Sequence, residues 1–145
     1  MPAKFDKMGI SFQYPENWTL DEEDALQGRD SVTVYTPGGG FWSVAVHPST
    51  TDPDQLAQAA VDAMRQEYDS LEVEGAHEAV EGYELKGYDL NFYCLDLINT
   101  ARVRCVRAGG GVYSVFCQAE DREFDQLALV FQAMTTSLLG GLCGP

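Results

Sequence analysis

Residues 31–64, SVTVYTPGGGFWSVAVHPSTTDPDQLAQAAVDAM, decide the fold because the chain uses their pattern twice. A strand pattern is followed by three glycines, a second strand pattern and a helix start. The same order returns around Gly109, which lies 71 positions after Gly38, and at that spacing Val44 corresponds to Val115. Two hairpin-plus-helix units of one length indicate the architecture, reached either by duplication or by the same solution arising twice.

Alternating residues in the first unit predict two strands. Val32 and Val34 fall on every second position, as do Trp42, Val44 and Val46, so each set lies on one face of its strand. The glycines between them predict a hairpin turn, because glycine adopts positive φ at little cost. A phosphate-binding loop is not expected, since no Lys-Ser or Lys-Thr follows and each loop joins two strands.

Helix signals follow each hairpin. Asp52 is a capping residue and Pro53 suits the first helical position, after which apolar residues recur at helical spacing. Asp121 opens a second such helix, which Gly140 ends. Strands joined by tight hairpins form antiparallel sheets. The expected fold is therefore α/β of the α+β type, with a mainly antiparallel sheet and two long helices packed on it, similar to an α/β/α sandwich.

Three further strands are expected, at residues 9–14, 71–80 and 83–98. Gly87 interrupts the last of these and predicts a bulge. Asn99 and Thr100 are expected to turn the chain into a strand over residues 101–107. A chain of 145 residues suits one domain, so residues 1–145 are taken as a single globular unit.

The net charge of the chain limits the classes of molecule that it is expected to bind. Nine basic and 23 acidic residues give a net charge of −14, which repels nucleic acid phosphates and anionic lipid heads but suits a basic protein. No apolar run approaches the roughly 20 residues that span a bilayer, and no apolar leader follows Met1. We therefore expect no nucleic acid partner, no membrane insertion and a cytoplasmic location.

Catalytic and metal-binding patterns are weak. A nucleophile needs a positioned base, and His47 and His77 are the two histidines in the sequence. None of the four cysteines forms a CxxC pair or lies at metal-ligand spacing from a histidine. The sequence therefore predicts no catalytic residue, no cofactor and no metal.

The expected hairpins set a register for the cysteines. A turn at Asn99-Thr100 places Cys94 opposite Cys105, and a turn centred on Gly110 places Cys117 opposite Val103. The three thiols would then share one face. They are either small buried hydrophobes or a cluster able to oxidise.

The same register gathers polar and apolar side chains on the opposite face. These candidate partner-binding residues are His47, Tyr93, Leu95, Arg102, Arg104, Ser114 and Phe116. Either other segments cover this face, with carboxylates pairing the arginines, or it binds an extended peptide, a helix or a second subunit.

Three segments carry a family resemblance: residues 10–18 (ISFQYPENW), 82–88 (GYELKGY) and 112–115 (VYSV). With the terminal helix, they resemble the PsbP-like and DcrB-like superfamily, which also includes a Ran-binding nuclear factor. The resemblance covers nearly the whole chain and implies binding rather than chemistry. We therefore expect a non-enzymatic protein-binding, adaptor or chaperone-like module, with an unknown protein partner or a homodimer. The alternative is a small enzyme or ligand-binding domain with a polar pocket between sheet and helices.

Overall fold

The computed structural model describes residues 2–28 and 30–142. Its elements in chain order are β1 (Pro2–Lys7), β2 (Ile10–Pro15), β3 (Thr19–Asp21), α1 (Glu23–Leu26), β4 (Ser31–Tyr35), β5 (Phe41–His47), α2 (Pro53–Glu67), β6 (Glu72–Val80), β7 (Tyr83–Cys94), β8 (Leu97–Ala108), β9 (Gly111–Glu120) and α3 (Asp121–Gly140).

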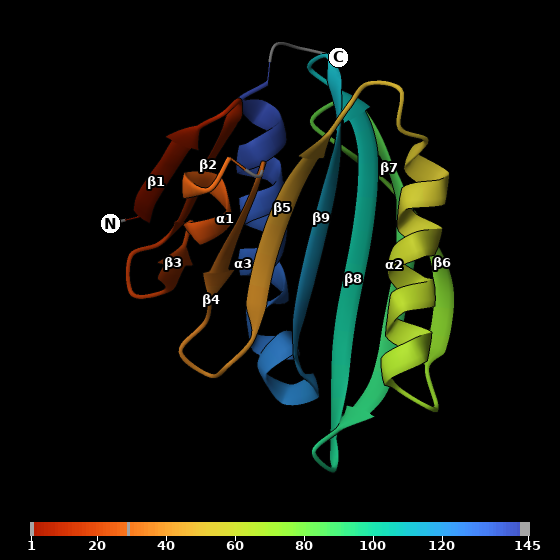
Figure 1. Ribbon diagram of the computed structural model, residues 1–145. Helices are drawn as coiled ribbons and strands as arrows, with labels where there is room; N and C mark the ends of the chain where they lie inside the picture. The colour runs from red at the N-terminus through yellow and green to blue at the C-terminus, as the bar shows by residue number, and fades with distance from the viewer. Residues whose placement is uncertain (1, 29, 143–145) are drawn as a thin grey trace.

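Seven of these strands form one antiparallel sheet in the order β3-β4-β5-β9-β8-β7-β6, and β1 pairs with β2 in a separate hairpin. Helix α2 lies over one face of the large sheet, while α3 lies over the other with the β1-β2 hairpin beside it (Figure 1). This arrangement confirms the α+β fold with a mainly antiparallel sheet and two long helices on it.

The larger core lies between the sheet and α3. Trp42 is fully buried, its ring packs 4.7 Å from that of Phe12, and its Nε1 donates to Thr135 Oγ1 at 3.2 Å. Trp18 packs edge-on against Phe131 at 5.7 Å. Both tryptophans therefore sit in close-packed surroundings.

The repeated units meet at the centre of the sheet. Strands β5 and β9 are neighbours, and Val44 lies directly opposite Val115. The helices that follow these strands cover opposite faces, since Ala57 of α2 packs with Val103 and Cys105, whereas Phe131 of α3 packs with Val115. The repeat therefore extends to the strands but not to the turns, because residues 36–40 form the first turn and Gly109-Gly110 the second. The helices do not follow the same symmetry either.

The expected start of α2 is confirmed, because Asp52 Oδ1 accepts from the Asp54 backbone N–H at 2.9 Å. Helix α3 begins at Asp121, but its cap is Glu120, whose carboxylate accepts from the backbone N–H groups of Arg122 and Glu123. A glutamate at this position reaches the same orphan donors that a shorter capping side chain serves.

Two expectations for the β7-β8 hairpin are wrong. The chain turns at Leu95-Asp96, where φ is 53° and 64°, and not at Asn99-Thr100. Two successive residues at positive φ form the tight hairpin turn that usually carries Asn-Gly. Because this turn carries Leu-Asp instead, it could not be recognised from the sequence. Gly87 is not a bulge, since β7 pairs without interruption on both sides. A Cβ at Gly87 would lie 1.8 Å from the Val103 carbonyl oxygen, so close backbone approach accounts for this glycine.

Candidate functional site

The residues predicted to form one partner-binding face lie at three separate places in the structure. The β8-β9 turn contains two residues, Gly109 and Gly110, so Arg102 pairs with Cys117 and Val103 with Phe116. The register expected from the sequence was one residue away from this. A slip of one residue moves every side chain of a strand to the other face. Ser114 and Phe116 therefore face α2, whereas Arg102 and Arg104 face α3.

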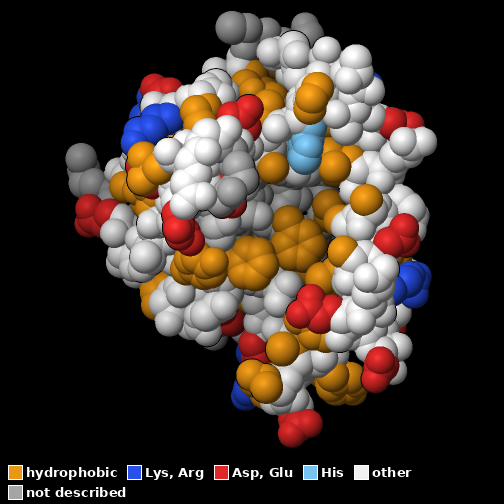
Figure 2. All heavy atoms as spheres, viewed as in Figure 1, with side chains coloured by type: hydrophobic (Ala, Val, Ile, Leu, Met, Phe, Trp, Pro, Cys, Tyr) orange, Lys and Arg blue, Asp and Glu red, His pale blue; other side chains and the backbone are white. Residues whose placement is uncertain are grey.

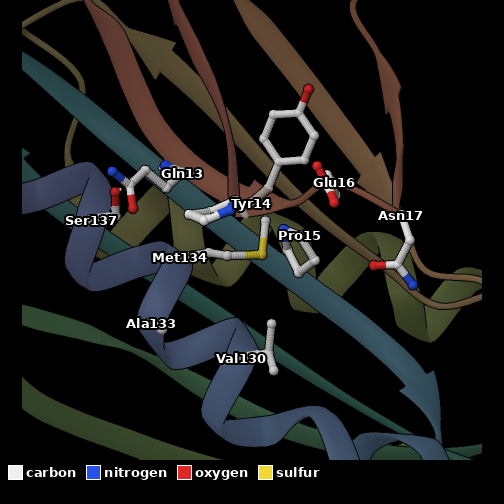
Figure 3. Close-up of a pocket in the computed structure, with 10 residues that line it drawn as sticks. Gln13, Tyr14, Pro15, Glu16, Asn17, Val130, Ala133, Met134 and Ser137 are labelled. Carbon is white, nitrogen blue, oxygen red and sulfur yellow. Dashed lines mark hydrogen bonds between the residues drawn. The ribbon is translucent and has the colours of Figure 1, made fainter.

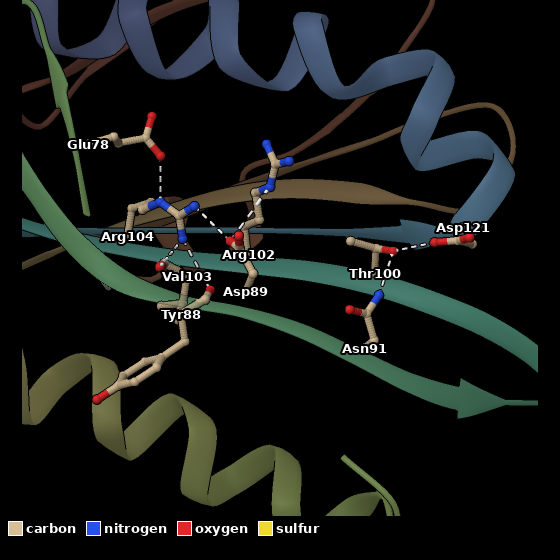
Figure 4. Close-up of polar contacts among 9 residues, drawn as sticks. All are labelled: Glu78, Tyr88, Asp89, Asn91, Thr100, Arg102, Val103, Arg104 and Asp121. Carbon is tan, nitrogen blue, oxygen red and sulfur yellow. Dashed lines mark hydrogen bonds and ion pairs between the residues drawn. The ribbon is translucent and has the colours of Figure 1, made fainter. Parts of the chain in front are cut away.

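Arg104 lies at the centre of a buried polar network (Figure 4). Its Nε donates to Glu78 Oε2 at 2.6 Å and its Nη2 to Asp89 Oδ1 at 2.7 Å. Nη1 donates to the carbonyl oxygens of Tyr88 and Val103 at 3.1 and 3.0 Å. With 8% of its surface exposed, Arg104 joins β6, β7 and β8 and is not accessible to a partner. The two carboxylates outweigh desolvation and raise the pKa of Arg104. Carboxylate pairing of the arginines, one of the two expectations, is thus what the structure contains.

Arg102 lies beside this network. Its Nε is 3.7 Å from Asp89 Oδ1, and its guanidinium carbon lies 4.9 Å from the centre of the Phe124 ring. The arginine is half-buried below the first turns of α3, so it fixes the sheet to the helix rather than forming a free cationic patch.

The face on the α2 side of β5 and β9 is partly open. Tyr35, Phe41 and Phe116 form a continuous row of rings, with centres 6.1 and 5.8 Å apart; we call these three residues the aromatic row. Figure 2 shows hydrophobic side chains gathered in a hollow over β4, β5 and β9. Phe116 is half-buried against α2, so it belongs to the core as much as to this surface.

His47 and Ser114 meet at the upper end of this open face. His47 Nε2 lies 3.0 Å from Ser114 Oγ, and burial lowers the pKa of His47. An imidazole beside a serine hydroxyl supplies two of the three members of a Ser-His-Asp triad. Within the described residues, no carboxylate hydrogen-bonds to the other ring nitrogen of His47, so the third member of a triad is not in place there.

The β7-β8 hairpin projects from the body of the molecule (Figure 1) and carries an exposed apolar cluster. We call Tyr93, Leu95, Leu97 and Ile98 the hairpin tip. Leu95 at its apex is 92% exposed and Tyr93 is 64% exposed. Tyr93 pairs with Ile98 across the hairpin, so these two share one face, and Leu97 pairs with Cys94 on the other. Apolar surface thus surrounds the end of the hairpin.

Hydrogen bonds brace the base of the hairpin against α3 (Figure 4). Asn91 Nδ2 donates to Thr100 Oγ1 at 3.0 Å, and Thr100 Oγ1 donates to Asp121 Oδ1 at 2.6 Å. A hollow of about 190 Å³ beside the tip is lined by Tyr93, Ile98 and Asp121, among others. Side-chain hydrogen bonds therefore fix the base of the hairpin from which the tip projects.

Sequence reasoning named Tyr93 and Leu95 but missed Leu97, Ile98, Tyr35 and Phe41. Leu97 and Ile98 were assigned to the end of a long strand, because no glycine or asparagine marked the turn at residues 95–96. Residues 93–98 contain five apolar residues around Asp96, and this run was the available signal for an exposed tip.

A larger hollow of about 510 Å³ lies between the turn after β2 and α3 (Figure 3). Its floor is apolar, with Pro15, Val130 and Met134, and its rim carries Gln13, Glu16 and Asn17. It adjoins the YPENW motif and lies outside the space between the large sheet and the helices, where a ligand pocket was expected.

The cysteines do not form the expected cluster. Cys105 packs below α2 and Cys117 packs on the α3 side, while Cys94 lies near the hairpin tip opposite Leu97. All three are free thiols, and burial raises the pKa of Cys105 and of Cys117 to about 12. Cys105 and Cys117 are small buried hydrophobes, Cys94 is half-buried, and Cys143 lies outside the described residues.

In the described part of the chain, no group of three or more histidine, cysteine or acidic side chains is placed to hold a metal ion. None of the helices in residues 2–28 and 30–142 is long and apolar enough to cross a membrane.

The sequence matches no family model and no curated protein, but the fold matches solved structures. CyanoP, the cyanobacterial PsbP of Synechocystis, has a TM-score of 0.61 at 17% identity, over 94% of this chain and 90% of that one. The Ran-binding protein Mog1p of Saccharomyces cerevisiae has a TM-score of 0.59 at 8% identity, over 94% of each chain. A putative regulator of unknown function from Pseudomonas aeruginosa has a TM-score of 0.59 at 10% identity, over 94% and 95%. These likenesses confirm the PsbP-like resemblance at the level of the fold.

Proposed function

We propose that this chain is a non-enzymatic protein-binding module of the adaptor or chaperone-like type, and that it docks its partner through the hairpin tip. One observation carries the proposal: four apolar side chains are exposed on a hairpin that hydrogen bonds hold at its base. Exposed apolar clusters of this kind are uncommon on proteins that act alone. One of the solved structures with this fold is described as a Ran-binding protein, which is consistent with a protein partner here.

The backbone at the apex strengthens the proposal. Leucine at positive φ costs about 1 kcal/mol or more, and Leu95 also exposes nearly its whole side chain. Neither feature stabilises the free protein. A large apolar residue at this position is accounted for if a partner buries it.

The partner should present an apolar pocket with basic residues around it. Asp96 lies within the tip, and Asp121 and Glu72 line the adjoining hollow. Apolar anchors in the centre of an interface supply most of its affinity, while charges at the rim choose the partner and accelerate association.

Site-specific photo-cross-linking tests this proposal. A benzophenone amino acid replaces Leu95 in one variant and Leu129 in a control variant, since Leu129 is 83% exposed on α3. In extracts of the source organism we expect a defined cross-linked product at position 95 and none at position 129. A product that is a second copy of the chain would identify the partner as a homodimer. Identical products from both positions, or none from position 95, would refute docking at the tip.

A second variant separates binding from folding. Replacing Leu95 with Asn and Asp96 with Gly installs the dipeptide that this turn prefers, so the hairpin should be retained while its apolar apex is lost. We expect an unchanged or higher melting temperature and loss of the partner. Retention of the partner by this variant would contradict the proposal.

The alternative function is binding of a small apolar ligand in the 510 Å³ hollow next to the YPENW motif. That volume lies within the usual range for ligand sites, and its apolar floor with a polar rim fits such a role. Replacement of Ala133 with Trp at the hollow should block a ligand and leave cross-linking at position 95 unaffected.

A further inference from the structure

We propose that the free edge of β6 accepts an additional strand from a basic, extended partner segment. In such a segment lysine or arginine side chains alternate with small apolar ones. Glu72, at the start of β6, also lines the hollow beside the hairpin tip, but the rest of this edge lies outside that hollow. The inference rests on the pairing and charge of β6 and does not depend on the function proposed above.

The two edges of the large sheet differ in length. At one edge, β3 has three residues, whereas at the other β6 has nine and pairs with β7 without interruption from Glu72 to Val80. In the described part of the chain, β6 is the last strand of the sheet and pairs with β7 alone (Figure 1). On its outer side, alternate backbone N–H and C=O groups therefore point outward, and a row of such groups can pair with another strand. The strand contains no proline that would interrupt this pairing.

The charges on β6 indicate which strand it can accept. Glu72 and Glu74 are exposed on the sheet face opposite α2, while Glu78 on the same face is paired with Arg104. Antiparallel pairing with a second copy about Ala76 would place Glu74 opposite Glu78, and like charges placed in this way disfavour pairing. The acidic edge therefore disfavours pairing with a second copy of the chain. A strand that carries basic side chains at these positions would instead be attracted to the glutamates of β6.

The other face of β6 offers space for the apolar side chains. A hollow of about 260 Å³ lies between α2 and the β6-β7 pair, and its lining includes Gly75, Ala57 and Tyr88 together with the charged or titratable Asp54, His77 and Lys86. A Cβ built at Gly75 has no atom within 4 Å. An added strand would place one side chain opposite Gly75, and a cross-strand neighbour can cover the space that an edge glycine leaves open.

The test uses a defined probe, the acetylated nonapeptide of alternating lysine and valine that begins and ends with lysine. Its matched control carries glutamate in place of lysine. Calorimetry measures affinity at pH 7.5 and 50 mM salt, and amide hydrogen exchange by NMR follows each β6 residue. We expect the lysine peptide to bind and to protect alternate β6 amides, and we expect the glutamate peptide not to bind.

Two variants locate the contacts. Gly75→Val places a branched side chain where a Cβ meets no atom within 4 Å, so it occupies part of the hollow and should weaken binding roughly fivefold or more. Ala79→Val, on the same face of β6, should have little effect. Reversal of Glu72 and Glu74 to lysine should weaken binding of the lysine peptide roughly tenfold. The inference is overturned if neither peptide binds, if both bind equally, or if binding leaves the β6 amides unprotected.

Discussion

Arg104 shows how much one residue contributes to this fold. Its guanidinium makes four hydrogen bonds, which reach Glu78 on β6, Asp89 and the Tyr88 carbonyl on β7, and the Val103 carbonyl on β8. The scarcity of cations in the sequence made this arginine conspicuous, and pairing with carboxylates was one expectation for it. Which carboxylates it would find was not predictable, because Glu78 and Asp89 are ordinary members of a large acidic set.

Replacing Arg104 with methionine should lower the free energy of unfolding by about 2–4 kcal/mol. The substitution keeps most of the side-chain volume but leaves two carboxylates and two carbonyl groups without their donor. Urea unfolding measures the loss. The control is Arg65→Met on the exposed side of α2, where the change should stay within about 0.5 kcal/mol. A loss below 1 kcal/mol for Arg104→Met would mean that solvent already satisfies the network.

At the scale of elements, the two glycines inside β6 and β7 have opposite roles. The sequence pattern predicts a bulge at Gly87, because glycine weakens a regular strand. A glycine also occurs in a strand where a neighbouring backbone approaches closely. This second reason cannot be recognised from a single sequence. The structure shows this second reason at Gly87, whereas Gly75 faces open space.

We therefore expect opposite effects from the same substitution at these two positions. Gly87→Ala places a Cβ 1.8 Å from the Val103 carbonyl oxygen, so β7 and β8 must separate, and the free energy of unfolding should fall by about 3 kcal/mol or more. Gly75→Ala meets no atom within 4 Å and should raise it by about 0.5–1 kcal/mol through the unfolded chain. Thermal unfolding of the two variants is the measurement. An equal loss of unfolding free energy in both variants would show that the contact with the Val103 carbonyl does not determine the effect of the substitution at Gly87.

For the whole molecule, the fold class followed from sequence periodicity, but the composition of the candidate surface did not. Strand alternation and helix caps reflect local physical chemistry, and the sheet with its two long helices was predicted from them. Which residues share a face depends on turns, and two turns were misplaced. Because the turn at Gly109-Gly110 has two residues, Ser114 and Phe116 lie on the sheet face opposite Arg102 and Arg104, whereas the predicted turn placed all four on one face. The turn at residue 95 was not predicted, because leucine seldom adopts positive φ, and the hairpin tip was therefore not recognised either.

The net charge of −14 makes a prediction about the whole molecule. Many surface carboxylates repel one another in the compact state, and this repulsion destabilises it when salt is low. The screening length falls from about 30 Å at 0.01 M salt to about 3 Å at 1 M. Relief of about 1 kcal/mol of repulsion would raise the melting temperature by roughly 3–4 °C, so we expect the melting temperature to rise with sodium chloride.

A charge-reduced variant is the matched control for this salt effect. Glu72→Gln with Glu74→Gln removes two exposed carboxylates from the acidic edge of the sheet and leaves the Arg104 network intact. The variant should melt higher than the native chain at low salt and gain less from added salt. Calorimetry at several salt concentrations measures both quantities. If the melting temperature falls as salt rises, attraction within ion pairs such as those of Arg104 outweighs the repulsion between the surface carboxylates.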